Sequence, residues 1–356
     1  MTSCRPNGPS VFFGGPQQPG RLRDLLAKHI DQVPAGGAID WVTYYFRDRR
    51  LAAELLAAHR RGVRVTVTVE KQPRTAHAND RVAALLDGPR GLGAGFRSLS
   101  LPLLPGSFKA SWEPHIHEKL YCFSHPQPVA FMGSYNPSGD QPEECPEIIQ
   151  EIGDQDRGYN LLVQVTDARL VGLLTAHARR LHRRKESFFQ RFSPFNNIAL
   201  RGHDWQVFFW PRITSHPVMR FLESLPPGSR IRIAISHLKG RSIARRLAGL
   251  AVRGMNLEVI ADSTLRRVPL SVEAIMDRAG IMFSRLGGLT GLPMHDKFVL
   301  VESGEQRWII FGSFNWTVRS WWLNQEIGLI SSNAALYESF AARWEELCAA
   351  AEEEND

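Results

Sequence analysis

Two stretches of the chain carry residue types that could act on a phosphate ester. The first reads HEKLYCFSHPQPVAFMGSYNPS over 117–138, and the second reads HDKFVLVESGEQRWIIFGSFNWT over 295–317. Each opens with His-x-Lys, continues as an apolar run and a turn, and ends a second apolar run in Gly-Ser-x-Asn. The histidine and the glycine are 16 residues apart in the first stretch (117 to 133) and 17 in the second (295 to 312). The same inventory at equivalent places indicates one chemical motif present twice.

The inventory fits a phosphodiester. Lysines neutralise non-bridging oxygens, hydroxyl and amide groups orient them, and two imidazoles can lie on opposite sides of phosphorus. Because side chains alternate along a strand, each histidine should share a face with the lysine two residues later. If the halves pack about a pseudo-twofold axis, both sets would meet at one central site. The predicted catalytic residues are His117, Lys119, His295 and Lys297, and the predicted phosphate-binding residues are Ser134, Asn136, Ser313 and Asn315.

A longer internal repeat predicts the elements that position these residues. The segment 36–65 aligns with 228–257 at a constant offset, without a gap. Each copy is a β-rich run, a helix with apolar residues at helical spacing, and a second β-rich run, with Gly62 and Gly254 suited to left-handed helix caps. Such β-α-β units predict an α/β protein of two tandem α-β-α sandwich halves related by pseudo-twofold symmetry, with mixed, mostly parallel sheets.

The repeat extends upstream and sets the predicted domain boundaries. SVFFGGP at 10–16 is similar to QVFFWPR at 206–212, and an amphipathic pattern follows each. We therefore predict one half over 10–190 and the other over 203–348, joined by a connection at 186–202 that contains Pro, Asn and Gly.

Composition narrows the partners and the compartment. The chain has 356 residues and a formal net charge of +7, which suits an anionic partner. We expect no membrane span, because no apolar run reaches about 18 residues. The N-terminus lacks the pattern of a secretory signal, so we expect a cytoplasmic protein, with peripheral association to an anionic inner membrane surface as an option. The spacing of Cys4, Cys122, Cys145 and Cys348 indicates reduced thiols rather than a metal site.

The doubled motif resembles that of the phospholipase D superfamily, whose mark is a pair of His-x-Lys-x4-Asp motifs followed by Gly-Ser-x-Asn. The resemblance runs from about residue 10 to 345. It implies a reaction without metal or cofactor, in which one histidine attacks phosphorus and forms a phosphohistidine while the other protonates the leaving oxygen. Water or an alcohol then releases the product. By position, His117 would be the nucleophile and His295 the general acid, with the reverse assignment left open.

The chain departs from the family pattern where the acid of each motif is expected. Ser124 and Glu302 stand there, so Glu302 is expected to substitute while the first half lacks the counter-charge. Asn324 and Glu326 occupy the place of a family Asn-x-Glu whose acid supports a histidine, and we take Glu326 as a second supporting residue. The first half has only Asn160 there. His115 is predicted to share the face of His117.

The shared motif does not separate the substrates of the superfamily, because every member attacks the same chemical group. Trp316, Trp321 and Trp322 could meet a lipid interface, stack on bases, or fill space between lobes. RSWWLNQE resembles cardiolipin synthase-like members, whereas GSFNWT is similar to small bacterial nucleases. We expect a phospholipid hydrolase or phosphatidyltransferase. The alternatives are a metal-independent nuclease on DNA or RNA, and a catalytically weak phosphate-binding protein.

Overall fold

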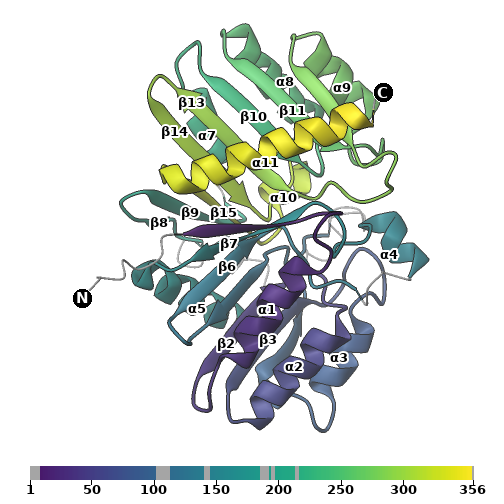
Figure 1. Cartoon of the computed structure of the whole chain (residues 1–356), viewed down its shortest axis with the longest axis vertical. Coiled ribbons are helices and arrows are strands. Elements are labelled where there is room, and N and C mark those ends of the chain that lie inside the picture. Colours follow the sequence, from purple (N-terminus) through teal and green to yellow (C-terminus); the bar gives the residue numbers. More distant parts are fainter. Residues whose placement is uncertain are drawn as a thin grey trace. The chain divides into compact units, whose positions relative to one another are not determined.

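The structure is a computed structural model that describes residues 9–101, 113–139, 145–184, 192–193, 197–212 and 216–354 (Figure 1). The chain divides into two compact units, residues 1–196 and residues 197–356. The division falls within the predicted connection at 186–202, most of which lies outside the described residues, as does Cys4. Each unit is described by itself below.

Unit 1 is built on a seven-stranded sheet in the order β1-β7-β6-β5-β2-β3-β4. Strands β2, β3 and β4 are parallel neighbours, and the other four neighbouring pairs are antiparallel. The strands are β1 (Ser10–Gly14), β2 (Ala38–Thr43), β3 (Arg64–Glu70), β4 (Phe96–Leu99), β5 (Leu120–Phe123), β6 (Val129–Gly133) and β7 (Asn160–Val165).

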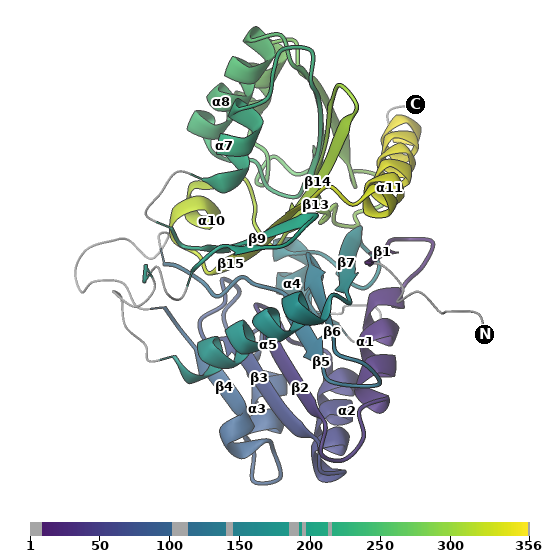
Figure 2. The same ribbon diagram turned by 90° about the vertical axis from the view of Figure 1, so that its left-hand side faces the viewer.

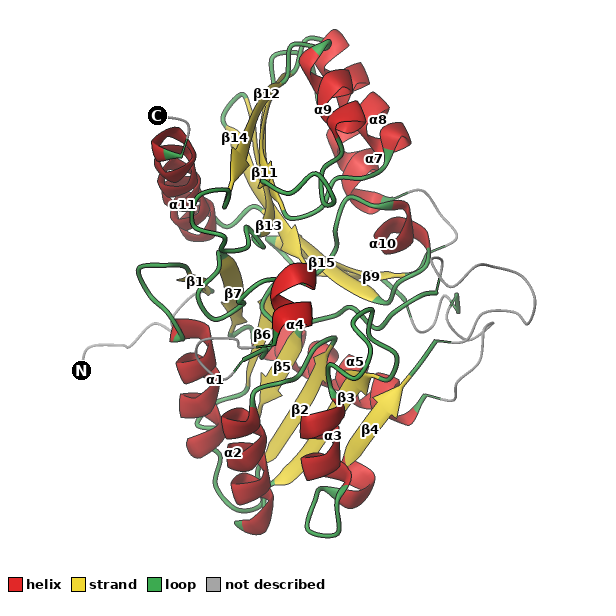
Figure 3. Ribbon diagram, turned by 90° about the vertical axis from the view of Figure 1, so that its right-hand side faces the viewer, coloured by secondary structure: helices red, strands yellow, loops and turns green. Residues whose placement is uncertain are grey.

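Helices cover both faces of this sheet. Helices α1, α2 and α3 lie on one face (Figure 3), where Leu26 and Leu55 pack into a core with Trp41 and Val67. Helix α5 lies on the other face (Figure 2) and contacts β2, β3, β5 and β6. The helices are α1 (Arg21–Asp31), α2 (Arg49–Arg60), α3 (Asp80–Asp87), the 3-10 turn η1 (Gly93–Gly95), α4 (Pro146–Glu151) and α5 (Ala168–Arg183).

Unit 2 repeats this plan on an eight-stranded sheet in the order β12-β11-β10-β13-β14-β15-β9-β8. Here β10, β11 and β12 are parallel neighbours, and the other five neighbouring pairs are antiparallel. The strands are β8 (Leu200–Arg201), β9 (Trp205–Trp210), β10 (Arg230–Ile235), β11 (Asn256–Asp262), β12 (Met282–Leu286), β13 (Lys297–Ser303), β14 (Gln306–Gly312) and β15 (Glu326–Ser331).

Its helices again form two layers. Helices α7, α8 and α9 lie on one face and the long α11 on the other (Figure 3). Trp316 and Trp321 belong to the core under α7 and α8, at 1% and 3% exposure, whereas Trp322 is exposed. Two of the three tryptophans of the second motif therefore fill the interior of unit 2 itself. The helices are α7 (Pro217–Glu223), α8 (Arg241–Val252), α9 (Leu270–Asp277), α10 (Val318–Trp322) and α11 (Ala334–Glu353).

The prediction of two similar α/β halves is confirmed, and the prediction of mostly parallel sheets is wrong. Parallel pairing follows the β-α-β units β2-α2-β3 and β10-α8-β11, as expected. The motif strands β5 and β6 are joined by residues 124–128 alone, and β13 and β14 by 304–305. Connections this short cannot carry the chain back to a parallel start, so these pairs are antiparallel hairpins.

The helix caps predicted from the repeat are present in both units. Gly62 has φ +91° and Gly254 has φ +86°, in the left-handed region that favours glycine. Their carbonyl oxygens accept equivalent hydrogen bonds, from Gly36 N at 3.0 Å and from Gly228 N at 2.8 Å. The β-α-β units thus share their closing bond as well as their sequence pattern.

Two further features bear on the expectations from composition. Cys122, Cys145 and Cys348 are free thiols, and burial raises the pKa of Cys122 to about 12. A helix with the length and apolar content to cross a bilayer is not found among the described residues.

Candidate active site

Each His-x-Lys segment lies at the entrance of a central strand. His117 and Lys119 directly precede β5, and Lys297 is the first residue of β13. Lys119 Nζ donates to the carbonyl oxygen of His117 at 2.8 Å, and Lys297 Nζ donates to that of His295 at 2.9 Å. Each ammonium is therefore held beside its own histidine, in the same way in both units.

These lysines are deeply placed. The exposure of Lys119 is 0% and that of Lys297 is 1%, in a class of residue that is almost never fully buried. In unit 1, the ring of Tyr44 lies 5.5 Å from Lys119 Nζ and 5.0 Å from the His117 ring, measured to the ring centroids. A buried cation over an aromatic face is stabilised by the ring quadrupole. Tyr44 therefore packs beside both His117 and Lys119.

The second strand of each motif brings Gly-Ser-x-Asn next to the lysine. The β5–β6 register pairs Leu120 with Met132, and Gly133 N donates to Lys119 O at 3.4 Å. The β13–β14 register, which pairs Phe298 with Phe311, sets Gly312 opposite Lys297. The two segments of each motif therefore lie side by side in both units.

The glycine of this motif is required by a close approach of two strands. A Cβ on Gly133 would lie 2.3 Å from the carbonyl oxygen of Leu161, and a Cβ on Gly312 would lie 2.3 Å from that of Ile327. The following serines donate their backbone N–H to those same oxygens, at 3.0 Å for Ser134 and 2.9 Å for Ser313. A side chain at either glycine would therefore open the motif.

The serine hydroxyls form hydrogen bonds within the protein, to residues at the start of β7 in unit 1 and of β15 in unit 2. Ser134 Oγ donates to Asn160 Oδ1 at 3.1 Å and accepts from Leu161 N at 3.0 Å. Ser313 Oγ donates to Glu326 Oε2 at 2.5 Å and accepts from Ile327 N at 3.1 Å. In both units the hydroxyl proton of the serine is therefore donated to a side chain of the protein. This bond orients Asn160 in unit 1 and Glu326 in unit 2.

Glu326 is held as a buried carboxylate. Its exposure is 0%, and Asn324 Nδ2 donates to its Oε1 at 3.1 Å. In unit 1 the equivalent group is the neutral amide of Asn160, whose Nδ2 donates to Gln155 O at 3.0 Å. The units therefore have different groups at this position, an amide in unit 1 and a carboxyl group in unit 2.

The motif asparagines are buried on the far side of the serines. Asn136 Oδ1 accepts from Tyr45 N at 3.4 Å, which ties it to the loop after β2. Asn315 is 8% exposed, and its Oδ1 has no hydrogen-bond partner among the described residues. A buried polar atom left in this way is rare in folded proteins and suits a site that a ligand or water completes.

The residue between histidine and lysine is an acid in both motifs, and it is a structural anchor. Glu118 lies 3.0 Å from His177 Nε2 on α5, and Asp296 accepts from Arg343 Nε on α11 at 2.9 Å. Burial raises the pKa of Asp296, and the charge of Arg343 partly offsets the rise. We did not predict these pairs from the sequence, although the recurrence of an acid in H-E-K and H-D-K is the signal that could have found them.

A second pair of acids holds the segment before each histidine. Glu70, at the end of β3, accepts from Ile116 N at 2.6 Å, and Asp262, at the end of β11, accepts from Met294 N at 3.2 Å. Burial raises the pKa of Glu70 to about 7. Asp262 also binds Arg267. The repeat offset relates residues 70 and 262, so the alignment itself contained this signal.

The residues at the expected acid positions lie at the far ends of their strands. Ser124 Oγ accepts from Ala38 N at 2.7 Å, which links the end of β5 to the start of β2. Glu302 accepts from Arg232 at 2.6 Å and from the Tyr337 hydroxyl at 2.5 Å. Although burial acts to raise it, the pKa of Glu302 is lowered by the Tyr337 hydrogen bond and the Arg232 charge. In the structure, Glu302 connects the sheet to α11.

His115 lies beside the first motif. Its Nδ1 is 3.9 Å from Glu70 Oε2, and its ring centroid is 5.3 Å from that of Tyr44. His115 and His117 thus contact the same tyrosine ring. His115 therefore lies near the motif, beside Glu70.

The comparisons with known proteins agree with this construction. A family model described as "Cardiolipin synthase, PLD-like domain" matches residues 30–166 and 226–348. No curated protein sequence matches the chain.

Solved structures share the fold. Phosphatidylserine synthase of Haemophilus influenzae has 11% sequence identity and a TM-score of 0.66, covering 96% of this chain and 86% of that one. Polyphosphate kinase of Porphyromonas gingivalis has 12% identity and a TM-score of 0.59, covering 96% of this chain and 50% of the kinase, so this chain spans about half the length of that protein. Since the family match covers most of the chain and both halves of the repeat, the chain belongs to the phospholipase D superfamily.

Proposed function

We propose that the chain cleaves a phospholipid phosphodiester through a phosphohistidine and transfers the phosphatidyl group to water or an alcohol. The observation that carries the proposal is the histidine, lysine and Gly-Ser-x-Asn arrangement, built twice with the same lysine-to-histidine bond. The match to the cardiolipin synthase domain supports a lipid substrate, as does the shared fold with a phosphatidylserine synthase.

In the proposed reaction, an imidazole nitrogen of His117 attacks phosphorus and forms the N–P bond. The P–O bond to the leaving group breaks, and His295 gives its proton to the departing oxygen. A water or alcohol then loses its proton to His295, attacks phosphorus and breaks the N–P bond, which restores both imidazoles. Lys119 and Lys297 neutralise the non-bridging oxygens as charge develops. The proposal requires both imidazoles to reach the same phosphorus.

The difference between Asn160 and Glu326 supports this assignment of roles. A carboxylate near an imidazole favours the protonated ring, whereas a neutral amide does not. The buried Glu326 belongs to the unit of His295, which must start as the acid, and Asn160 belongs to the unit of His117, which must start with a free electron pair. We infer that each group acts on the histidine of its own unit, and on this inference the difference matches the two roles that the reaction needs.

Asn136, Asn315 and the two serines complete the proposed site in different ways. The amide of Asn315, with its unpartnered oxygen in the described part of the chain, is the motif group best placed to take a ligand. Ser134 and Ser313 orient Asn160 and Glu326 instead of donating to phosphate. Glu302 supports unit 2 through α11, at the opposite end of β13 from His295.

The test is turnover of mixed phospholipid vesicles in the presence of EDTA, read by lipid mass spectrometry, with single- and double-stranded DNA and RNA assayed separately. We expect release or exchange of a lipid headgroup, and no turnover by His117→Ala. His59→Ala is the matched control, because His59 is exposed on α2. Cleavage of nucleic acid without lipid turnover would establish the nuclease alternative, and binding without turnover of either would establish a phosphate-binding protein.

The covalent step has its own test. Reaction mixtures quenched in alkaline denaturant should yield a peptide with a phosphatidyl group on His117, since phosphohistidine survives alkali better than acid. A modified His295 peptide in its place would reverse the two roles while leaving the reaction type intact.

A further inference from the structure

Unit 2 contains a groove whose lining includes none of the predicted site residues. It lies between helix α7 and the outer strands β8, β9, β14 and β15, and its volume is about 500 Å³. Pockets of about 300 to 1,000 Å³ are the usual size for small ligands. Its lining runs from Ala199 to Ser332, within one unit.

The floor of the groove is apolar. Phe208 and Ile330 are buried, and Phe221 of α7 and Trp308 of β14 are partly exposed on its wall. The rings of Phe221 and Trp308 pack edge to face, with centroids 5.3 Å apart and an interplanar angle of 76°. Ring edges and aliphatic groups offer area to a hydrocarbon chain but no open parallel slot for a planar base.

Three arginines surround this floor: Arg201, Arg212 and Arg220. Arg212 Nη1 donates to Asn197 O at 2.6 Å, and its buried Nε has no partner among the described residues. Burial, and next the charge of Arg220, lower the pKa of Arg212. Arg201 lies beside the neutral amide of Gln206.

The nearby acids are engaged elsewhere. Glu223, on the same helix as Arg220, accepts from Arg246 Nη2 at 2.6 Å. Asp204, which lines the groove, accepts from Asn333 Nδ2 at 3.2 Å. No ion pair joins an acid to the three groove arginines in the described part of the chain. Three arginines against one acid, Asp204, leave the lining with a net positive charge beside the apolar floor.

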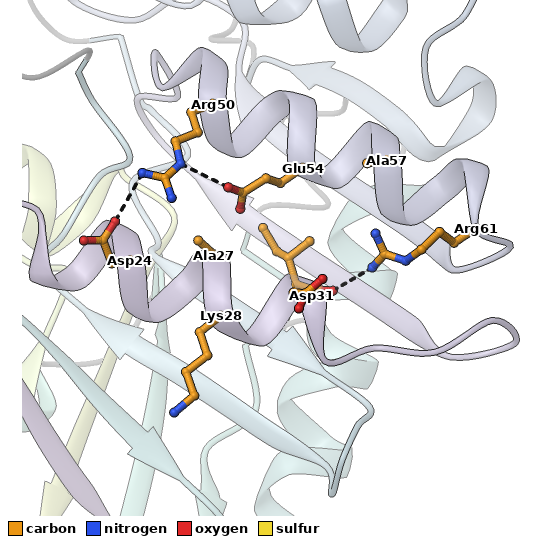
Figure 4. A pocket seen from close by; sticks show the side chains of 9 residues that line it. Asp24, Ala27, Lys28, Asp31, Arg50, Glu54, Ala57 and Arg61 are labelled. Atoms are coloured by element: carbon orange, nitrogen blue, oxygen red, sulfur yellow. Dashed lines mark hydrogen bonds and ion pairs between the residues drawn. The ribbon is translucent and has the colours of Figure 1, made fainter.

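A groove in unit 1 shows the opposite arrangement (Figure 4). It lies between α1 and α2, has a volume of about 300 Å³ and is also rich in charged side chains. There Arg50 bridges two acids, with Asp24 at 3.6 Å and Glu54 at 3.2 Å, and Arg61 donates to Ile30 O at 3.2 Å. Those charges neutralise one another, so that groove offers no net charge to a ligand.

We propose that the groove of unit 2 binds an anionic phospholipid, with its phosphate on Arg212 and Arg220 and the start of its acyl chains on Phe208, Phe221 and Trp308. Guanidinium groups without acid partners are the preferred ligands of phosphate, and an apolar floor beside them fits an amphiphile. This site is additional to the proposed reaction and does not depend on it. It would hold a lipid that is not being cleaved.

The test is isothermal titration with dihexanoyl phosphatidic acid below its micelle concentration. Arg220→Gln should weaken binding about tenfold or more, because it removes one charge-assisted hydrogen bond. Arg245→Gln, an exposed arginine on α8, is the matched control and should bind as the parent protein does. Hydrolysis of bis(p-nitrophenyl) phosphate should be the same in both variants. Failure of the proposed reaction would leave this binding in place.

Three results would overturn the site. Equal affinity for glycerol 3-phosphate would show that the apolar floor contributes nothing. Loss of binding in Lys297→Gln and not in Arg220→Gln would place the lipid at the histidine motif. Tighter binding of oligothymidylate, lost in Arg220→Gln, would show that the groove binds nucleic acid.

Discussion

The two units have similar main-chain hydrogen bonds around their motifs, and they differ more in the side chains that surround those motifs. In both, the loop after the first strand of the repeat binds the end of the motif: Arg47 N donates to Pro137 O at 2.7 Å and Lys239 N to Trp316 O at 3.2 Å. The serine-centred bonds and the lysine-to-histidine bonds also correspond. The side chain that accepts from the serine hydroxyl is different, however. It is the amide of Asn160 in unit 1 and the carboxyl group of Glu326 in unit 2.

This comparison teaches which parts of a duplicated site can change. Main-chain hydrogen bonds position the motif residues, and equivalent bonds are present in both units although the surrounding side chains differ. The group bonded to each serine hydroxyl is a single side chain, Asn160 or Glu326, which can change without moving a strand. The four predictions below test this division, starting with the largest expected effect.

The first prediction distinguishes the roles of the two histidines by comparing substrates with different leaving groups. His117→Ala should lower kcat by at least about 10³-fold for every substrate, because no N–P bond can form. His295→Ala should lose about 10² to 10⁴-fold with an alkyl leaving group. It should lose far less with p-nitrophenolate, which departs without a proton. Steady-state rates on both substrate types check this, and the reverse pattern would exchange the two roles.

The second prediction concerns the framework that the units share. Gly133→Ala and Gly312→Ala should each lower the free energy of unfolding by about 2 to 3 kcal/mol, because both place a Cβ against a carbonyl oxygen. Gly172→Ala in α5 and Gly249→Ala in α8 are the matched controls, since a Cβ meets nothing within 4 Å at either position. The controls should gain about 0.5 to 1 kcal/mol. Urea unfolding measures all four, and a tolerated motif alanine would contradict the close approach.

The third prediction uses the acids that brace the segments before the histidines. Burial raises the pKa of Glu70 from 4.5 to about 7. For an acid with a raised pKa in the folded state, the stabilising contribution is present below the unfolded value and is lost as pH rises through the folded value. Relative to Glu70→Gln, the parent protein should therefore lose roughly 3 kcal/mol of unfolding free energy between pH 4.5 and 7.

Asp156, with a pKa raised to about 7 by burial, titrates in the same window, so the difference between parent and variant curves is the quantity to measure. Asp262→Asn provides the contrast, because it leaves Arg267 buried without its acid and should destabilise unit 2 throughout this range. A flat difference curve for Glu70→Gln would show that Glu70 is not the titrating group.

The fourth prediction tests the difference between Asn160 and Glu326 directly, by exchanging amide and carboxyl groups at these positions. Glu326→Gln keeps the shape of the side chain but favours a neutral imidazole, so the alkaline fall in activity should move to lower pH. At the alkaline end, kcat for an alkyl leaving group should drop about tenfold. Asn160→Asp makes the opposite change in unit 1 and should slow the attack at low pH. Unchanged pH profiles in both variants would separate these groups from the histidines.

Much of the fold was predictable because it repeats. The alignment of 36–65 with 228–257 predicted both β-α-β units and their left-handed caps. The direction of most strand pairs was missed, because the reasoning started from the crossover units. A connection of a few residues, such as 304–305, already implies an antiparallel pair.

The buried anchors were harder to predict for a physical reason. Glu118 and His177 are separated by 59 residues, and Asp296 and Arg343 by 47, with no periodicity to link them. The partners also differ between the units, histidine in one and arginine in the other, so the repeat hides the correspondence. Only packing of α5 and α11 on their sheets brings each pair together.

The bond from each lysine to the carbonyl oxygen of its own histidine has a consequence for how such a site can be inherited. The histidine and the lysine belong to one three-residue module that needs no distant segment to join them. Copying that short module copies the imidazole together with its neighbouring ammonium group, and the surroundings of each copy can then diverge by substitution elsewhere.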